Sequence, residues 1–351
     1  MEVYIQVYKI NNGNEGVLQE PKSGLVMLLF VLETRRAPSC LHEMVFADCS
    51  SERDSHCVSR LCIDNYKILC KQIENSTCIL PAMMLYWKEN FTEEGQMHKK
   101  PKAIILDLDG TLLHTDKSIS PRTLKVIEQC KNAGILVIVA TARFWFKAEK
   151  YLEMIRPDYA ILADGTQIYR NDEMICGFAM SEQSVNGVIQ ALKKQEPFGE
   201  FVVSVGKELL CSASGISEQW RRSYAFEDTL SRPVYKIAAM LESADVAEKL
   251  SVDYDCRLYS YRDENLYGFT AKEAGKYQAV RALSKFLGID LQDMVAFGDD
   301  ENDYEILKYC GTGVAMANAI PQIREVADTI TDSNDEDGVA AYLERYFTNL
   351  N

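Results

Sequence analysis

The sequence contains no apolar run long enough to cross a membrane. Its longest run, Gly24–Leu32, has about half of the roughly 20 residues that a transmembrane helix needs. No basic cluster precedes this run, and Arg35 and Arg36 follow it where a secretory signal would carry small residues. We therefore expect a cytoplasmic protein without a membrane anchor.

An excess of positive charge is also missing. The 351 residues include 38 lysines and arginines against 52 aspartates and glutamates, for a formal net charge of -14. Nucleic acids and anionic lipid surfaces are bound by basic surfaces, so we expect neither as a partner. The sequence also gives no sign of an obligate protein partner.

Cysteine pairs of the metal-binding type are absent as well. None of the 11 cysteines forms a C-x-x-C pair, so a sulfur-ligated metal has little support. In a cytoplasmic protein these thiols should stay reduced. Six of them, from Cys40 to Cys78, lie in the first 100 residues, which sets that region apart.

Residues 1–96 show neither a clear periodicity nor a recognisable motif. Two interpretations stay open. This region is an upstream reading frame and translation begins at Met97, or it is a cysteine-rich accessory domain. We favour the first. A chain of this length exceeds what one hydrophobic core usually organises, so we expect two or three domains.

From residue 102 onward, short apolar runs alternate with helix-like segments, and both return near the C-terminus. Strands of this kind, buried on both faces, are typical of a parallel sheet. The pattern predicts an α/β fold with a doubly wound, mostly parallel, Rossmann-like core sheet. The expected strands are 103–108, 136–140, 159–163, 294–297 and 313–316, and the expected helices are 120–133, 144–155, 276–287 and 303–309.

The core sequence is interrupted by a segment of a different kind. Helical stretches there alternate with strand-like ones at 201–205, 234–240 and 257–261. We interpret it as an inserted α+β domain. The predicted organisation is a first part of the core at 97–179, the insertion at 180–262 and the second part of the core at 263–351.

Two aspartates stand where the first predicted strand ends, in the segment 107–112. Ligands of open α/β sheets bind at this end of the strands. Residues two apart in an extended chain point the same way, so Asp107 and Asp109 share one side. Two adjacent carboxylates favour a hard cation, and Mg2+ is the natural choice beside a phosphate. One carboxylate can attack phosphorus while the other protonates the leaving oxygen and later activates water.

Polar groups also follow or flank other strands of the predicted sheet. Thr141, after the second strand, could hold a phosphate oxygen together with free backbone N–H groups of its loop. Asp299, after the strand 294–297, is placed to be another Mg2+ ligand, and Asn302 could contact phosphate. Lys276 opens a helix and could balance the carboxylates and the transferring phosphoryl group, with Lys272 as a rival.

In this order, these residues resemble the haloacid dehalogenase-like (HAD) phosphatase superfamily, specifically its Cof-type branch with a type-IIB cap. The resemblance extends from Lys102 to about Phe347. It implies that Asp107 is the nucleophile that becomes phosphorylated and that Asp109 is the acid/base. The G-D-x-x-N-D signature matches residues 298–303, which makes Asp303 a supporting residue.

The resemblance also implies that Mg2+ is held in part by the main-chain carbonyl of Asp109. The complete predicted site is as follows: catalytic, Asp107, Asp109 and Lys276; phosphate-binding, Leu108, Thr141, Ala142, Lys276 and Asn302; metal, Asp107, Asp109 and Asp299; supporting, Gly110, Thr111 and Asp303.

Two departures from the family pattern stand close to this site. The family often has T-G-R where this chain has Thr141-Ala142-Arg143, and often N-G where it has Asp164-Gly165. Neither removes a reacting group. The second precedes the insertion and could change what the pocket accepts.

The resemblance implies an Mg2+-dependent phosphatase for phosphomonoesters of small metabolites such as sugar phosphates, nucleotides or cofactor phosphates. The inserted domain should close over the rest of the substrate. Its basic residues Arg221, Arg222 and Lys236 could meet an anionic leaving group, although surface charge or packing is the commoner role. Two alternatives remain: a phosphotransferase or phosphomutase with the same intermediate, and a regulatory binding homologue with little turnover.

Overall fold

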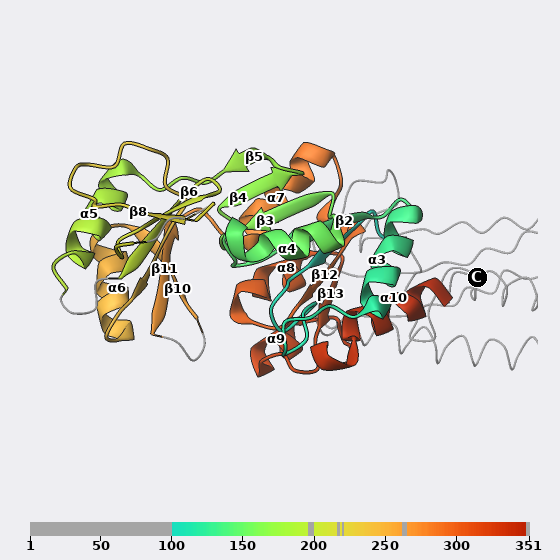
Figure 1. The fold of residues 1–351 in the computed structure, drawn as a ribbon. Coiled ribbons are helices and arrows are strands. Elements are labelled where there is room, and N and C mark those ends of the chain that lie inside the picture. Colours follow the sequence, from blue (N-terminus) through green and yellow to red (C-terminus); the bar gives the residue numbers. More distant parts are fainter. Residues whose placement is uncertain (1–99, 196–199, 216–217, 220, 262–264, 349–351) are drawn as a thin grey trace, which may run out of the picture. The chain divides into compact units, whose positions relative to one another are not determined.

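The computed structural model describes residues 100–195, 200–215, 218–219, 221–261 and 265–348 (Figure 1). Residues 1–96, for which two interpretations stayed open, lie outside the described residues. None of the helices in the described ranges is both long and apolar enough to pass through a membrane.

The larger of two sheets has eight strands in the order β14-β13-β12-β1-β2-β3-β4-β5. The six from β14 to β3 run parallel, and β4 and β5 return antiparallel. The predicted doubly wound, mostly parallel sheet is therefore confirmed. Its strands are β1 (Ala103–Leu106), β2 (Leu136–Ala140), β3 (Tyr159–Leu162), β4 (Gln167–Arg170), β5 (Glu173–Gly177), β12 (Met294–Gly298), β13 (Thr312–Ala315) and β14 (Thr329–Ile330).

Helices cover both faces of this sheet, which explains why its central strands are continuously apolar. In β1, Ile104 and Leu106 pack with three helices on one face, whereas Ala103 and Ile105 pack with three others on the opposite face. The first set is α3 (Pro121–Asn132), α4 (Trp145–Ile155) and α10 (Gly338–Thr348), and the second is α7 (Lys276–Leu287), α8 (Tyr304–Tyr309) and α9 (Pro321–Val326).

Local signals set the ends of these helices. The Ser120 hydroxyl caps α3 by accepting a hydrogen bond from the Thr123 N–H, and Pro121 takes the first helical position. Helix α4 begins one residue later than predicted because Phe144 is still extended and forms its N-cap. Helix α7 begins at Lys276, as the sequence predicts.

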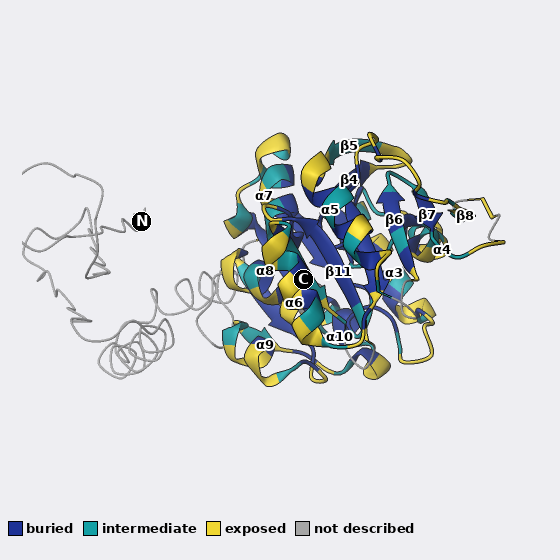
Figure 2. Cartoon of the chain, turned by 90° about the vertical axis from the view of Figure 1, so that its left-hand side faces the viewer, coloured by how far each residue is buried: buried dark blue, intermediate teal, exposed yellow. Residues whose placement is uncertain are grey.

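The inserted domain contains the second sheet, with six strands in the order β10-β11-β9-β6-β7-β8. Two helices pack on it around a separate hydrophobic cluster. Figure 2 shows buried residues along strands such as β11 and exposed ones along α6. The elements are β6 (Phe201–Val205), β7 (Glu208–Cys211), β8 (Arg221–Ser223), β9 (Lys236–Met240), β10 (Cys256–Ser260), β11 (Leu266–Ala271), α5 (Glu182–Leu192) and α6 (Ala244–Asp253).

One predicted boundary needs correction. The insertion was expected to end at residue 262, but β11 pairs with both β10 and β9 in the same antiparallel sheet. Strand β11 lies between these two strands and five of its six residues are buried, so it cannot belong to the core sheet. The inserted domain, called the cap below, therefore continues to Ala271.

Candidate active site

Three buried carboxylates meet at the carboxyl ends of β1 and β12. One oxygen each from Asp107, Asp299 and Asp303 lies within 4.8 Å of the others. The Lys276 ammonium enters this group from the start of α7. Its Nζ lies 2.5 Å from Asp107 Oδ1, 2.7 Å from Asp303 Oδ1 and 3.2 Å from Asn302 Oδ1. The structure thus brings together five of the predicted site residues.

Negative charge exceeds positive charge in this cluster. Burial raises the pKa of Asp107 well above its ordinary value, and the charges of Asp303 and Asp299 add to the rise while Lys276 opposes it. Burial also raises the pKa of Asp299 to about 7. For Lys276, burial alone would lower the pKa, but Asp107 and Asp303 raise it above its ordinary value. Lys276 therefore stays charged, and three buried carboxylates share its single positive charge, an arrangement that favours the binding of a further cation.

The donor set fits a hard divalent cation such as Mg2+, because it offers only carboxylate oxygens from buried, fixed side chains. Asp299 accepts a hydrogen bond from Thr111 Oγ1 at 2.9 Å. The other oxygen of Asp303 accepts from the Asp299 N–H at 3.2 Å. Gly110 has φ +78°, and a Cβ there would lie 2.4 Å from Asp299 Oδ2, so the turn requires glycine.

The Asp109 carboxylate lies outside this cluster and forms a second one. It accepts two hydrogen bonds from Arg143, at 2.6 and 2.7 Å, and one from Lys117 at 2.8 Å. Burial would raise its pKa, but these bonds outweigh burial and lower the pKa of Asp109 to about 2. Any metal contact from this residue would come from its main-chain carbonyl, as the resemblance implied. Arg143 was not predicted as a site residue, although the motif of Thr141 contains it.

The remaining predicted residues lie in the turns around these clusters. Thr141 is buried, and its hydroxyl accepts from the Arg143 N–H at 3.2 Å. The Leu108 carbonyl closes the turn after β1 by accepting hydrogen bonds from the N–H groups of Thr111, Leu112 and Leu113. Lys272, the rival of Lys276, is 66% exposed and pairs with Asp255 instead.

A buried ion pair joins the core to the cap beside the Thr141 loop. Asp164, in the turn after β3, lies 2.5 Å from Lys236 Nζ of β9 and accepts from the Tyr261 hydroxyl at 2.6 Å. Lys236 also donates to the Ala142 carbonyl at 3.0 Å. Lys236 is thus paired within the protein, and Arg221 and Arg222 pair with Glu218 and Glu208. In the sequence, the sign of this ion pair was that Asp164-Gly165 stands where the family often has N-G.

Comparison with known proteins places this geometry in a family. Residues 104–343 match the haloacid dehalogenase-like hydrolase family, and the chain belongs to it. The Bacillus subtilis 5-amino-6-(5-phospho-D-ribitylamino)uracil phosphatase YitU is 25% identical over 72% of this chain and 100% of its own length. The Methanothermobacter thermautotrophicus phosphoglycolate phosphatase is 27% identical over 70% of this chain and 97% of its own.

Solved structures agree on the fold. A haloacid dehalogenase-like hydrolase from B. subtilis, 24% identical, superposes with a TM-score of 0.61 and covers 69% of this chain and 99% of its own. The subclass IIB sugar phosphatase BT4131, 20% identical, gives a TM-score of 0.59 and covers 70% and 99%. The predicted family, fold class and enzyme class, phosphoric monoester hydrolase, are therefore confirmed.

Proposed function

We propose that this protein hydrolyses phosphomonoesters of small metabolites, with Mg2+, through an aspartyl-phosphate on Asp107. The observation that carries the proposal is the buried group of Asp107, Asp299 and Asp303 bridged by Lys276 at the carboxyl end of β1. Such a group has a nucleophile, a fixed cation and oxygen ligands for a metal within one hydrogen-bonded cluster.

In the first step, the free oxygen of Asp107 attacks phosphorus and the bond to the leaving oxygen breaks. Lys276 holds the other oxygen at 2.5 Å, which orients the carboxylate, and its positive charge favours the ionised form that burial disfavours. Bound by Asp107, Asp299 and the Asp109 carbonyl, Mg2+ would supply the positive charge that lets a phosphate approach these carboxylates. Asp109 gives a proton to the leaving oxygen. The Thr141 hydroxyl and the Ala142 N–H group bind the phosphoryl oxygens.

In the second step, water attacks the phosphorus of the aspartyl-phosphate and gives its proton to Asp109, so inorganic phosphate leaves and Asp107 is restored. Arg143 and Lys117 hold Asp109 as a carboxylate, which is the form that accepts this proton. The first step needs the protonated form. We therefore expect substrate binding to displace at least one of these cations from Asp109.

The relatives support the substrate class. YitU is named for a phosphorylated ribityl compound, the archaeal relative for phosphoglycolate, and BT4131 as a sugar phosphatase. All of these are small phosphorylated metabolites. We propose the same class for this protein, with the cap selecting the particular compound.

The test is phosphate release from a panel of phosphorylated metabolites with Mg2+, before and after Asp107→Asn. We expect the substitution to lower kcat at least ~10³-fold because no carboxylate remains to attack phosphorus. Asp116→Asn, at an exposed position in the following loop, is the matched control. Chelation of the metal should also stop release. Equal release by wild type and Asp107→Asn would refute the nucleophile assignment, and transfer to an alcohol instead of water would indicate a phosphotransferase.

A further inference from the structure

The loop to which we assign phosphate binding, Thr141-Ala142-Arg143, rests on the turn that follows β3. The Ala163 N–H donates to the Arg143 carbonyl at 2.9 Å, and the Asp164 N–H donates to the Thr141 carbonyl at 3.3 Å. The turn therefore holds the first and the last carbonyl of the phosphate loop. The carbonyl of Ala142, between them, has a different partner.

This middle carbonyl is held from the cap. Lys236, the first residue of β9, donates to the Ala142 carbonyl at 3.0 Å. The same ammonium lies 2.5 Å from Asp164 Oδ2, which also accepts from the Tyr261 hydroxyl at 2.6 Å. Asp164, Lys236 and Tyr261 are called the junction cluster below. Through it, a strand of the cap is bonded to the phosphate loop of the core.

The junction cluster is tightly packed as well as bonded. Asp164 is 0% and Lys236 is 2% exposed. The Lys236 ammonium lies over the rings of Phe144 and Tyr261, 4.5 and 4.8 Å from their centroids. On the neighbouring strand β11, a Cβ at Gly268 would lie 2.6 Å from the Tyr261 hydroxyl and 3.2 Å from Lys236 Cε. Packing this close fixes the position of the ammonium relative to the loop.

Stability alone does not explain why these charges are buried here. Asp164 Oδ1 is buried and, among the described residues, has no hydrogen-bond partner. Ala163 and Asp164 also have φ of +51° and +59°, a conformation that is costly for residues other than glycine. A buried ion pair with an unsatisfied oxygen is weak evidence for stability, and strained backbone is typical of functional sites. The cluster therefore indicates a role in the adjacent active site.

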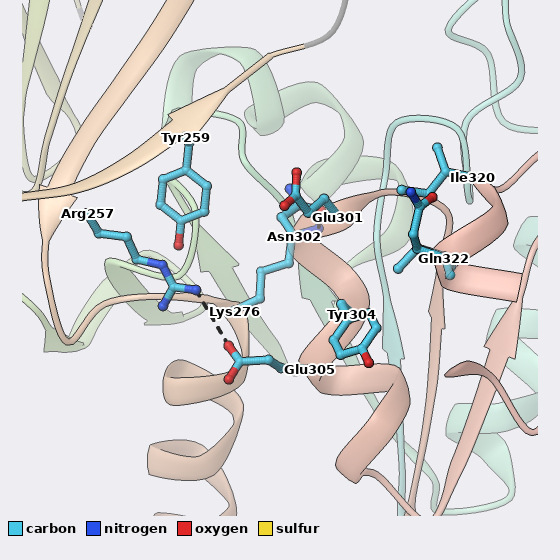
Figure 3. Close-up of a pocket in the computed structure, with 10 residues that line it drawn as sticks. Arg257, Tyr259, Lys276, Glu301, Asn302, Tyr304, Glu305, Ile320 and Gln322 are labelled. Carbon is cyan, nitrogen blue, oxygen red and sulfur yellow. Dashed lines mark hydrogen bonds and ion pairs between the residues drawn. The ribbon is translucent and has the colours of Figure 1, made fainter. Parts of the chain in front are cut away.

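The cap is also held to the core at a second place, which does not involve the phosphate loop. Arg257 of β10 donates to the Ala274 carbonyl at 2.8 Å and lies 3.5 Å from Glu305 of α8 (Figure 3). It lines a cavity of about 480 Å³ to which Lys276 contributes, whereas the junction cluster is not part of that lining. Attachment of the cap therefore does not by itself account for the bond from Lys236 to the loop.

The two carbonyls that the junction cluster holds also fix two N–H groups, because a peptide group is planar. The Thr141 carbonyl, held by the Asp164 N–H, shares its peptide plane with the Ala142 N–H, which we assign to phosphate. The Ala142 carbonyl, held by Lys236, shares its plane with the Arg143 N–H. That N–H donates to the Thr141 hydroxyl at 3.2 Å. Both phosphate-binding groups of the loop are thus oriented from the junction cluster.

We propose that Lys236, held by Asp164, is a positioning residue for phosphate binding, acting through the Ala142 carbonyl on the loop that carries the Thr141 hydroxyl. The inference rests on the proposed phosphatase function, which assigns this loop to phosphate. It also gives a reason for an aspartate where the family often has asparagine, since the carboxylate keeps a buried ammonium at the loop.

The test separates the bond to the loop from the burial of charge. Lys236→Met removes the donor and leaves the Asp164 charge buried, whereas Asp164→Asn combined with Lys236→Met removes both. Both variants should bind inorganic phosphate roughly 10-fold more weakly than wild type, measured by calorimetry with Mg2+, because a charged donor to the loop is lost. The double variant should melt closer to wild type than Lys236→Met, because no uncompensated charge stays buried.

A purely structural role of Lys236 gives a different pattern, in which phosphate affinity returns together with the melting temperature in the double variant. Equal phosphate affinity of wild type and the double variant therefore overturns the inference, and so does absence of phosphate binding to wild type. If Lys236→Met does not fold, the double variant alone decides.

Lys193→Met is the matched control. Lys193 is also a cap lysine that donates to a main-chain carbonyl, but its acceptor is Phe226 of the cap, at 2.9 Å. This variant should bind phosphate as tightly as wild type. An equal loss of affinity in Lys193→Met and in the double variant would overturn the inference, because the effect would not depend on the loop.

Failure of the phosphatase proposal gives a separate result. Wild type would then release phosphate from none of the metabolites in the panel with Mg2+. Calorimetric binding of inorganic phosphate does not require turnover, so the comparison of wild type with the double variant still decides the role of Lys236.

Discussion

Lys276 is the residue on which the acidic cluster depends. Its ammonium is fully buried and contacts Asp107 and Asp303 at hydrogen-bond distance. Burial raises the pKa of Asp107, and Lys276 is the neighbour that opposes this rise. A nucleophilic carboxylate must be ionised, so the lysine contributes to reactivity as well as to position. Lys272, four residues earlier, makes none of these contacts.

Lys276→Met should therefore lower kcat/KM for any phosphomonoester substrate by at least ~10²-fold, because it removes a fixed cation from the nucleophile and the phosphoryl group. The measurement is phosphate release, with melting temperatures to confirm folding. Lys272→Met is the matched control and should retain activity, since Lys272 is 66% exposed. A larger loss in Lys272→Met than in Lys276→Met would reverse the assignment.

At the scale of secondary-structure elements, the turn between β3 and β4 fixes where α7 begins. Gly165 has φ +86°, and a Cβ there would lie 2.2 Å from the carbonyl carbon and oxygen of Gly275 and 2.5 Å from the Lys276 nitrogen. The backbone of this turn thus packs directly against the backbone that carries Lys276. Only glycine allows so close an approach.

Gly165→Ala should destabilise the protein and also reduce phosphate release, because α7 must move away from Asp107. Gly134→Ala is a suitable reference, since Gly134 also has a positive φ, +74°, but nothing within 4 Å of its added Cβ. The shared backbone strain should cost about 1–2 kcal/mol in both, and the clash at Gly165 about 1–3 kcal/mol more. Urea unfolding gives these values. Equal values and equal activity would mean that the turn does not position α7.

The core elements were predictable because their signals are local. The buried strands are visible in the sequence as short apolar runs, and Ser120 and Pro121 mark the start of α3. Strands β4, β5 and β11 were not predicted. They pair antiparallel, and their mixed composition carries no clear alternation. Their assignment depends on neighbours rather than on local sequence.

The predicted site residues came from motifs at strand ends, where topology alone brings them together. The hydrogen bonds from Arg143 to Asp109 and the ion pair of Asp164 with Lys236 could not be predicted in the same way. Both depend on side-chain directions, and the second joins the core to the inserted cap.

At the scale of the whole molecule, every residue to which we assign a role in the proposed reaction lies within residues 100–348. Among the described residues, both sheets, the acidic cluster and the hydrogen bonds from Arg143 to Asp109 belong to this range. The family match covers residues 104–343. Domains with their own hydrophobic core usually fold alone, and this range contains separate clusters for the core sheet and the cap.

A variant that begins at Met97 should therefore retain the kcat/KM and the melting temperature of the full chain, because no group in the proposed reaction is removed. Phosphate release and thermal unfolding of the two proteins, side by side, test this. A clear loss of stability or activity would show that residues 1–96 contribute contacts and favour the accessory-domain interpretation. Mass spectrometry of the native protein separates the two interpretations directly, since stoichiometric peptides from residues 12–88 would exclude a start at Met97.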